Sequence, residues 1–344
     1  MDSVTHVLFG AAAGQATLGK KEGNKAMVWG AIAQTVPDLD VFAALFMDPV
    51  SYLSIHRGFT HSLFFPFIAA PLLAWLACSI HSKTTKSSLR EWTGMFFVVV
   101  LLHPLLDLFT GYGTQLFYPI TDYGYELNTI FIIDPLFTLP LIIGVFYSFI
   151  SNYKKEFDFK PARIALTISL SYLIFTGALK LSVLPEVEKQ LQKHEIEFHQ
   201  RHISPTPFNS FYWRVLAEVE DGYKEGYISL FNTDNEPDFF FIPRNSDKIE
   251  PYRDTYAFGE LMWFSKGFYS VTEAEDGTLY FNDLRFGSIP GWTGEVDEFV
   301  FRFRLIEPEN PANKEQFAFE QDSDFPEVSP HDFRIFFRKV FGRQ

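Results

Sequence analysis

The sequence predicts a multi-pass α-helical membrane domain of four to six membrane helices, followed by a soluble β-rich (α+β) domain. The net charge of −13 is unevenly distributed, because residues 1–184 contain 12 Lys/Arg and 12 Asp/Glu and are neutral as a group. Four long apolar stretches lie within this neutral part, and short segments with alternating apolar residues lie after it. We therefore divide the chain into a membrane domain at 1–184, a charged helical connector at 185–204 and an acidic β-rich domain at 205–344.

The apolar stretches of the first domain approach the length of a bilayer crossing, which is about 20 residues. The four strongest are 63–81, 92–110, 130–151 and 163–184. Two earlier stretches, 4–19 and 26–46, are shorter or more polar. We expect both to be embedded in the membrane and packed against protein, with a re-entrant arrangement as the alternative for 4–19. The small residues from Gly10 to Gly14 allow close helix contact there. A cleavable signal peptide is not expected, because no Lys or Arg precedes the first apolar run.

The loops in which Lys and Arg cluster indicate the orientation of the chain. They are 20–25, 82–91 and 152–163, and six spans place all three on one side of the membrane. Since basic loops tend to stay in the cytoplasm, the amino terminus and everything after residue 184 are expected outside. The predicted location is the inner (plasma) membrane, with the carboxy-terminal domain on the periplasmic or extracellular side.

The carboxy-terminal part shows the patterns of strands. Apolar residues alternate in 213–231 and 298–306, and Asp276-Gly277 marks a turn between two further runs. Residues 252–265 can form a helix. The acidic balance argues against a nucleic-acid partner, which would need basic patches. A lid or a module that binds a protein partner fits this domain better.

The strongest functional signal is a set of ionisable residues inside or beside the apolar stretches, where charges are costly. All are histidines or aspartates: His6, Asp38, Asp40, His56, His61, His103, Asp107 and Asp134. Imidazoles and carboxylates are ligands of zinc, manganese and non-haem iron. A single cysteine, Cys78, excludes a cysteine-based zinc site and a disulfide scaffold. The predicted topology puts every member of the set on the outer side, so loop charges and ligand chemistry both indicate one outward-facing cluster.

Two pairs within this set have few structural explanations. His56 and His61 stand five apart in the chain, with Gly58 between them to give the backbone freedom and hydroxyl residues on either side of His61. His103 and Asp107 stand four apart, which puts them on one face of a helix. We interpret both pairs as parts of a metal site.

The other residues of this set, and Arg57 beside them, can also have roles other than metal binding. His6 can bond backbone groups at a helix start, and Asp38 and Asp40 follow a proline and can be turn residues. Asp134 can be a ligand, a hydrogen-bond acceptor behind a ligand or a helix cap. Arg57 can clamp an anionic substrate with two hydrogen bonds or pair with a carboxylate.

The remaining histidines are set aside. His81 ends a span at the opposite membrane face and His331 is isolated, whereas the connector histidines are expected on a solvated face: His194, His199 and His202. The chain contains no H-E-x-x-H motif, which argues against a zincin-type protease.

Four motifs follow one another along the first domain. They are Thr5-His6 with the small-residue helix after it, Pro37-Asp38-Leu39-Asp40, His56-Arg57-Gly58-x-Thr60-His61-Ser62, and His103-x3-Asp107 with Thr110-x-Tyr112-Gly113-Thr114. Together they resemble the YdjM/YbcI family of bacterial inner-membrane proteins, which are described as metal-dependent hydrolases, one member also as LexA-binding. The resemblance covers roughly residues 1–184, and the domain after residue 200 looks like the extension of the longer members.

The His/Asp set is also similar to the zinc-dependent phospholipase C and single-strand nuclease superfamily, whose multinuclear site includes an H-x3-D pair. The later His and the H-x3-E pair of that superfamily have no clear counterparts in this chain. The number of metal ions therefore stays open.

The residues and the resemblance together imply a membrane-embedded metal-dependent hydrolase at the outer face of the inner membrane. One or two divalent ions, with Zn²⁺ preferred over Mn²⁺ or Fe²⁺, are expected on His6, Asp38, His61, His103 and Asp107, with Asp40 and His56 as alternates. A metal-activated water attacks, Asp40 or Asp134 serves as general base, and Arg57 stabilises developing negative charge. Lateral access from membrane lipids indicates a lipidic or amphipathic substrate with an ester or phosphoester bond.

Two other classes stay open. A metal-ion transporter or metal sensor uses the same ligands without catalysis, but a transporter should carry ionisable residues through the inner halves of its spans, and these are almost bare. In a membrane-anchored scaffold the acidic domain carries the function and the helical domain is only an anchor. An anchor, however, does not need this many buried charges.

Overall fold

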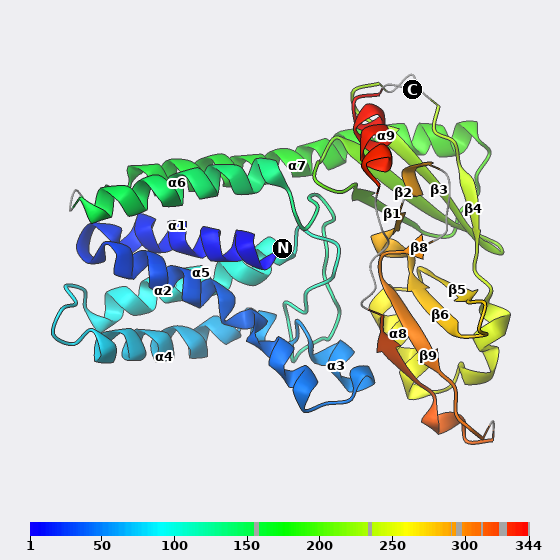
Figure 1. Cartoon of the computed structure of the whole chain (residues 1–344), viewed down its shortest axis with the longest axis horizontal. Coiled ribbons are helices and arrows are strands. Elements are labelled where there is room, and N and C mark those ends of the chain that lie inside the picture. Colours follow the sequence, from blue (N-terminus) through cyan, green and yellow to red (C-terminus); the bar gives the residue numbers. More distant parts are fainter. Residues whose placement is uncertain are drawn as a thin grey trace. The chain divides into compact units, whose positions relative to one another are not determined.

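The computed structural model describes residues 1–154, 158–232, 236–289, 291–293, 298–310, 312–322 and 329–342. They form two compact units. The helical unit comprises residues 1–45, 55–178 and 207–209, and the second unit comprises 46–54, 179–206 and 210–344. The predicted architecture, a helical part followed by a sheet-rich part, is confirmed (Figure 1).

Six helices contribute to the helical unit and run up and down beside one another (Figure 1). They are α1 (Ser3–Glu22), α2 (Asn24–Thr35), α4 (Phe65–Ile80), α5 (Leu89–Asp107), α6 (Pro135–Tyr153) and α7 (Lys160–Lys193). Three short segments follow α2 in the chain: the 3-10 helix η1 (Pro37–Leu45), α3 (Pro49–Ile55) and the 3-10 helix η2 (Phe59–His61). Helix α2 ends at Thr35, and Val36 after it still has helical dihedral angles; Pro37 then begins η1, because proline has no backbone N–H to continue the hydrogen bonds of α2.

Helices α1 and α2 approach each other through glycines. A Cβ atom built on Gly14 would lie 2.0 Å from the carbonyl oxygen of Ala26, and one on Gly30 would lie 2.2 Å from that of Gly10. No side chain fits at such distances, so these positions need glycine for the two backbones to meet. The close helix contact predicted from the small residues of this segment is confirmed.

Replacing Gly14 by alanine is therefore expected to lower the free energy of unfolding by about 1–3 kcal/mol, because the added methyl group must push α1 away from α2. The measurement is the unfolding midpoint of the full chain in detergent. Gly94→Ala is the matched control, since a Cβ on Gly94 of α5 meets nothing within 4 Å. Equal midpoints for both variants would contradict the packing argument.

By length and apolar composition, three helices of the described chain can cross a membrane: α5, α6 and α7. A fourth span results if α4 is joined with the preceding segment Pro49–His61, from which it is bent by 66°. Four to six membrane helices were predicted, and the structure supports at most four. Helix α2 has 12 residues and is therefore only about 18 Å long. Helix α1 ends in charged residues and packs against α2, α5 and α6, whereas α2 leaves Val28 and Ile32 exposed on its other face.

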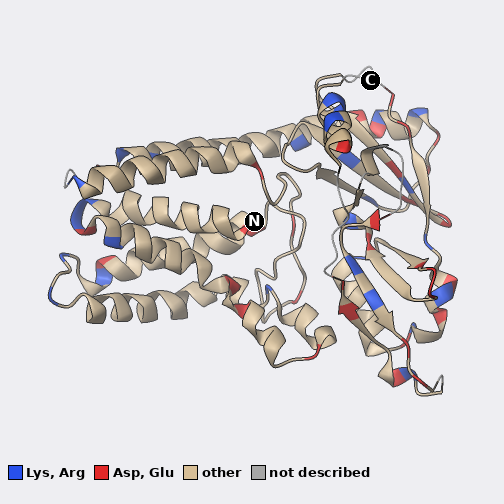
Figure 2. Cartoon of the chain, viewed as in Figure 1, with Lys and Arg blue, Asp and Glu red and all other residues tan. Residues whose placement is uncertain are grey.

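The basic loops share one end of the helical unit (Figure 2). The turn between α1 and α2 has Lys20, Lys21 and Lys25 in or beside it. The connection from α4 to α5 has Lys83, Lys86 and Arg90, and the connection from α6 to α7 has Lys154, Lys160 and Arg163. Helices that alternate in direction bring these loops together. The predicted grouping of the three loops on one side of the bundle is therefore present.

The second unit is built on antiparallel strands. One sheet has the order β1-β2-β3-β4, another β10-β9-β6-β5, and β7 pairs with β8. The strands are β1 (Arg201–Pro205), β2 (Tyr212–Val219), β3 (Gly222–Ser229), β4 (Phe240–Pro243), β5 (Tyr269–Glu273), β6 (Leu279–Asp283), β7 (Ser288–Ile289), β8 (Glu298–Phe299), β9 (Arg302–Ile306) and β10 (Ala318–Gln321). The helices are α8 (Tyr256–Ser265) and α9 (Pro330–Val340). The predicted strands, the turn at Asp276-Gly277 and the helix within 252–265 are all confirmed.

The segment 185–204, predicted as a separate helical connector, is arranged differently. Helix α7 continues without a break through Pro185 to Lys193, and β1 begins at Arg201. The continuation is stabilised by Val183, Val187 and Leu191, which recur one turn apart and pack in a core with residues of β1, β2 and β3. His202, predicted on a solvated face, is buried because it points inward from β1.

Candidate metal centre

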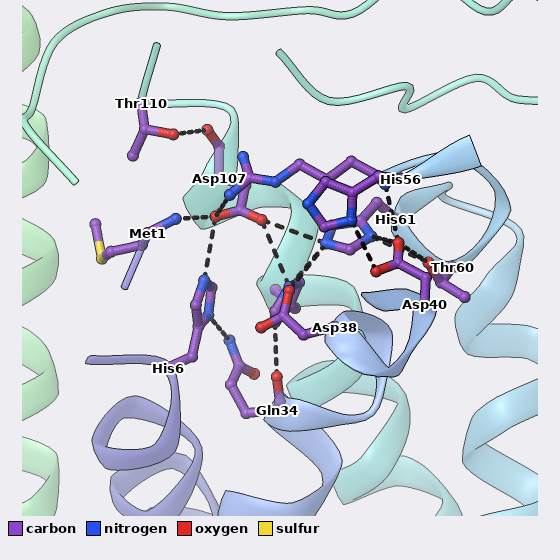
Figure 3. Close-up of polar contacts among 12 residues, drawn as sticks. Met1, His6, Gln34, Asp38, Asp40, His56, Thr60, His61, Asp107 and Thr110 are labelled. Carbon is purple, nitrogen blue, oxygen red and sulfur yellow. Dashed lines mark hydrogen bonds and ion pairs between the residues drawn. The ribbon is translucent and has the colours of Figure 1, made fainter. Parts of the chain in front are cut away.

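Four predicted ligands converge at one end of the helical unit (Figure 3). Asp38 lies at the start of η1, His61 ends η2, and His103 and Asp107 lie one turn apart near the end of α5. One ligand atom from each lies within 4.8 Å of the other three. His61, His103 and Asp107 are fully buried, whereas 28% of the Asp38 side chain is exposed, so the cluster opens to its surroundings beside Asp38.

The five distances that involve an imidazole nitrogen are close to those of a tetrahedral metal site, and the two carboxylate oxygens lie within 4.8 Å of each other. The Nε2 atoms of His61 and His103 are 3.1 Å apart, and Asp38 Oδ1 lies 3.4 and 3.3 Å from them. Asp107 Oδ2 lies 3.5 Å from both Nε2 atoms. A tetrahedral ion with bonds of about 2.0–2.1 Å separates its ligand atoms by roughly 3.3–3.4 Å. A divalent ion the size of zinc therefore fits between these four atoms.

Hydrogen bonds on the outer side of each imidazole indicate which ring nitrogen carries the proton. Nδ1 of His103 lies 2.6 Å from the carbonyl oxygen of Gln34, which can only accept, so this nitrogen donates. Nδ1 of His61 lies 3.1 Å from the Thr60 hydroxyl and 3.4 Å from Asp40 Oδ2. A neutral imidazole protonated on Nδ1 presents a lone pair on Nε2, as a metal ligand requires.

The centre of the cluster consequently gathers acceptors without donors. Two Nε2 lone pairs face two carboxylate oxygens, and one of these, Asp107 Oδ2, is buried and accepts no hydrogen bond from the described part of the chain. Acceptors at these distances repel one another unless a cation or proton lies between them. The donor set therefore fits a cation.

His6 has a different place from the one predicted. Its Nδ1 lies 3.2 Å from the side-chain amide nitrogen of Gln34, which donates, so its Nε2 donates to Asp107 Oδ1 at 3.1 Å. Its ring stacks on that of His103, with centroids 3.9 Å apart. In this arrangement His6 positions Asp107 and His103, and its Nε2 proton leaves no lone pair for a metal.

Asp40 is surrounded by donors. Its Oδ2 accepts from the backbone N–H of Arg57 at 2.9 Å and from the Thr60 hydroxyl at 3.0 Å, and its Oδ1 lies 3.0 Å from Nδ1 of His56 (Figure 3). The carboxylate thus lies behind His61, on the side away from the other ligands. Of the two histidines in this motif, His61 belongs to the cluster, whereas His56 is held beside it by Asp40.

Three neighbours of the cluster were not singled out from the sequence, and one of them is Met1, whose buried amino group donates to Asp107 Oδ1 (Figure 3). Gln34 contacts both His6 and His103, and the Tyr112 ring lies 4.5 Å below the guanidinium carbon of Arg57. The available signal for Gln34 was its amide in an otherwise apolar stretch. Tyr112 carried no signal of its own, because an aromatic residue after a membrane helix is common.

Asp134 has the role of a helix cap. Its Oδ1 accepts from the backbone N–H of Leu136 at 2.9 Å, where α6 begins, and its Oδ2 accepts from the Tyr172 hydroxyl at 2.9 Å. The position favours the capping alternative over a ligand or general base. His81, which was set aside, accepts from the Trp29 indole at 3.0 Å, at the end of the bundle with the basic loops.

Comparison with known proteins gives one family and one relative. The model of a family described as YdjM inner membrane protein matches residues 1–183. The uncharacterized protein YfhP of Bacillus subtilis (strain 168) is 26% identical over 310 residues, which cover 78% of this chain and 89% of that protein. This similarity extends beyond the family match into the carboxy-terminal part. No solved structure gives a significant match.

Proposed function

Because the chain belongs to the YdjM inner membrane protein family, we propose that it is a membrane-embedded hydrolase whose divalent metal ion is held by Asp38, His61, His103 and Asp107. The observation that carries the proposal is that two carboxylate oxygens each lie 3.3–3.5 Å from both Nε2 lone pairs, with no donor from the described residues between them. When bound, a divalent ion supplies Lewis acidity and lowers the pKa of water. We propose zinc because the spacing matches its bond lengths.

We propose that His56, held in place by Asp40, accepts a proton from the attacking water molecule. A carboxylate that accepts from Nδ1 of an imidazole holds the ring in the tautomer whose other nitrogen accepts a proton. The 3.0 Å contact between Asp40 Oδ1 and His56 Nδ1 supports this pairing, and the two imidazole rings of His56 and His61 have their centroids 6.3 Å apart. A water molecule activated beside His61 is therefore within reach of His56 through one further hydrogen bond.

A lipidic or amphipathic substrate is supported by the apolar surface next to the ligands. In η1, Asp38 and Asp40 turn toward the centre, whereas Leu39 and Phe42 between and after them are half exposed. Phe59 in η2 is also exposed. These side chains can contact acyl chains while the carboxylates and histidines meet the polar group to be cleaved.

The proposed side of the membrane is the outer one. The three basic loops lie together at one end of the bundle and the metal ligands come from the segments at the other end (Figure 2), and basic loops are retained in the cytoplasm. A metal-ion transporter is the alternative. Among the described residues, the cluster is the one group of three or more His, Cys, Asp or Glu side chains that could hold a metal, which favours a one-sided site. At the basic end, Asn152 bonds Gln15 and Asn24, His81 bonds Trp29, and Glu22 bonds Thr85.

Hydrolysis that depends on metal tests the proposal. The full chain in detergent should cleave p-nitrophenyl esters or phosphoesters, lose the activity after treatment with a chelator, and regain it with added Zn²⁺. In sealed membrane vesicles, a substrate that does not cross the bilayer should be cleaved in right-side-out vesicles and spared in inverted ones. Activity that survives complete metal removal would contradict the metal role, and cleavage confined to inverted vesicles would contradict the orientation.

A further inference from the structure

Arg57 is held in an unusual backbone conformation beside the cluster. Its φ is 58°, in the left-handed region that residues other than glycine rarely adopt. The peptide is fixed on both sides, because its N–H donates to Asp40 Oδ2 at 2.9 Å and its carbonyl oxygen accepts from the backbone N–H of Gln115 at 3.2 Å. Strain of this kind persists where the surroundings over-determine a conformation, and it is frequent at functional sites.

The Arg57 side chain is buried, but not all of its hydrogen-bond donors are satisfied. Only 11% of it is exposed, its guanidinium carbon lies 4.5 Å over the ring of Tyr112, and Nη2 lies 3.7 Å from Asp107 Oδ1. The Nε and Nη1 atoms are buried and have no hydrogen-bond partner among the residues that the structure describes. A buried guanidinium has five N–H groups to satisfy, and the contact with Asp107 is too long for a hydrogen bond.

We infer that Arg57 binds a phosphoryl group, and that the substrate of this site is therefore a phosphate ester rather than a neutral carboxylic ester. The inference rests on the proposed function, and it names the substrate class. A guanidinium fixed by stacking offers a planar set of donors that matches phosphate oxygens, and its charge has no counterpart in a neutral ester. A phosphoryl group also has enough oxygen atoms for some to bind Arg57 while another lies at the metal site.

The reaction of such a substrate with water is balanced without a further reactant. The water oxygen bonds to phosphorus, the bond from phosphorus to the ester oxygen breaks, and the products are an alcohol and a phosphate. One proton of the water goes to the alcohol oxygen and the other stays with the phosphate. Arg57 keeps its proton throughout, because its role is to bind and orient the anion.

The test is binding of inorganic phosphate to the full chain in detergent, loaded with Zn²⁺ and freed of excess metal, by titration calorimetry. Arg57→Gln should retain its zinc and bind phosphate about 10–100-fold more weakly than the wild type, because charge-assisted hydrogen bonds are lost. Arg57→Lys should fall between them, since lysine keeps the charge without the planar fork. Arg90→Gln, an exposed arginine at the other end of the bundle, is the matched control and should bind phosphate as the wild type does.

A second titration, with micelle-free dihexanoyl phosphatidic acid, separates the two sources of the phosphoryl group. Tighter binding than that of inorganic phosphate supports a lipid headgroup, and equal or weaker binding supports a soluble phosphate ester. Zinc-loaded wild type that does not bind phosphate, or an Arg57→Gln variant that retains zinc and binds phosphate unchanged, would overturn the inference while leaving the metal site intact. Wild type that holds no zinc would overturn the proposed function itself.

Discussion

Replacement of His103 by alanine is expected to reduce the affinity for zinc by at least about 100-fold, so that the purified variant no longer retains stoichiometric metal. His103 contributes one of the four converging ligand atoms, and its ring also stacks on that of His6. His61→Ala is expected to have the same effect, because His61 Nε2 lies 3.1 Å from His103 Nε2 across the same centre. The measurement is metal per protein after gel filtration, together with competition against a chelator of known affinity.

His81→Ala is the control for this pair of substitutions. It removes the same type of side chain from the same unit, but at the end with the basic loops, where His81 contacts Trp29. Zinc should also raise the unfolding temperature of the wild type and of His81→Ala, corresponding to about 2.7 kcal/mol at a concentration of 100 times Kd. No such rise is expected for His103→Ala. A wild-type protein without stoichiometric metal, or a His103→Ala variant that keeps it, would refute the metal site.

The second large effect is expected for Asp40→Asn. This carboxylate accepts from Arg57 N–H and the Thr60 hydroxyl, and it lies 3.0 Å from His56 Nδ1 and 3.4 Å from His61 Nδ1. An amide can accept with only one of its two ends, so the ring of His61 and the backbone of Arg57 both lose part of their support. Zinc affinity should fall about 10–100-fold, as is typical of a partner behind a ligand, and the rate of hydrolysis should fall further because His56 is no longer oriented.

Asp134→Asn is the matched substitution for this comparison. Asparagine is as good a residue at the start of a helix as aspartate, so α6 keeps the bond from Leu136 N–H, whereas the bond accepted from the Tyr172 hydroxyl is lost and lowers the free energy of unfolding by about 1 kcal/mol. Zinc affinity and hydrolysis should be unchanged. The pair is measured by chelator competition and by initial rates at saturating zinc. Loss of activity in Asp134→Asn with Asp40→Asn unaffected would reverse the roles that the contacts assign to these two aspartates.

Much of the site could be predicted from residue chemistry and local spacing. His103 and Asp107 stand four apart within an apolar helix, and that spacing alone puts them on one face. Asp38 follows the proline that ends α2, and His61 belongs to a motif of two histidines around a glycine. The positions of the basic loops also predicted that these four residues share one end of the bundle, because the loops lie together at the opposite end.

The roles of the remaining predicted residues depended on contacts between distant segments. His6 carries the right chemistry for a ligand, but the amide of Gln34 makes its Nδ1 an acceptor and turns its proton toward Asp107. Asp134 was open between ligand, acceptor and cap, and its hydrogen bond from Leu136 N–H at the start of α6 favours the cap. Neither outcome is readable from spacing, since each depends on which donor happens to face the side chain.

The sequence by itself determined the division into a neutral helical half and an acidic strand-rich half, and it identified the imidazoles and carboxylates of a metal site. These properties are local, because periodicity, length of apolar runs and charge counts need no knowledge of neighbours in space. Only the tertiary structure decided that α1 packs against α2, α5 and α6, that α7 continues through Pro185, and that the oxygens of Asp38 and Asp107 each lie within 3.5 Å of both imidazole nitrogens. Those facts depend on the close approach of glycines and on helix packing, which bring together ligands up to 69 positions apart in the chain, Asp38 and Asp107.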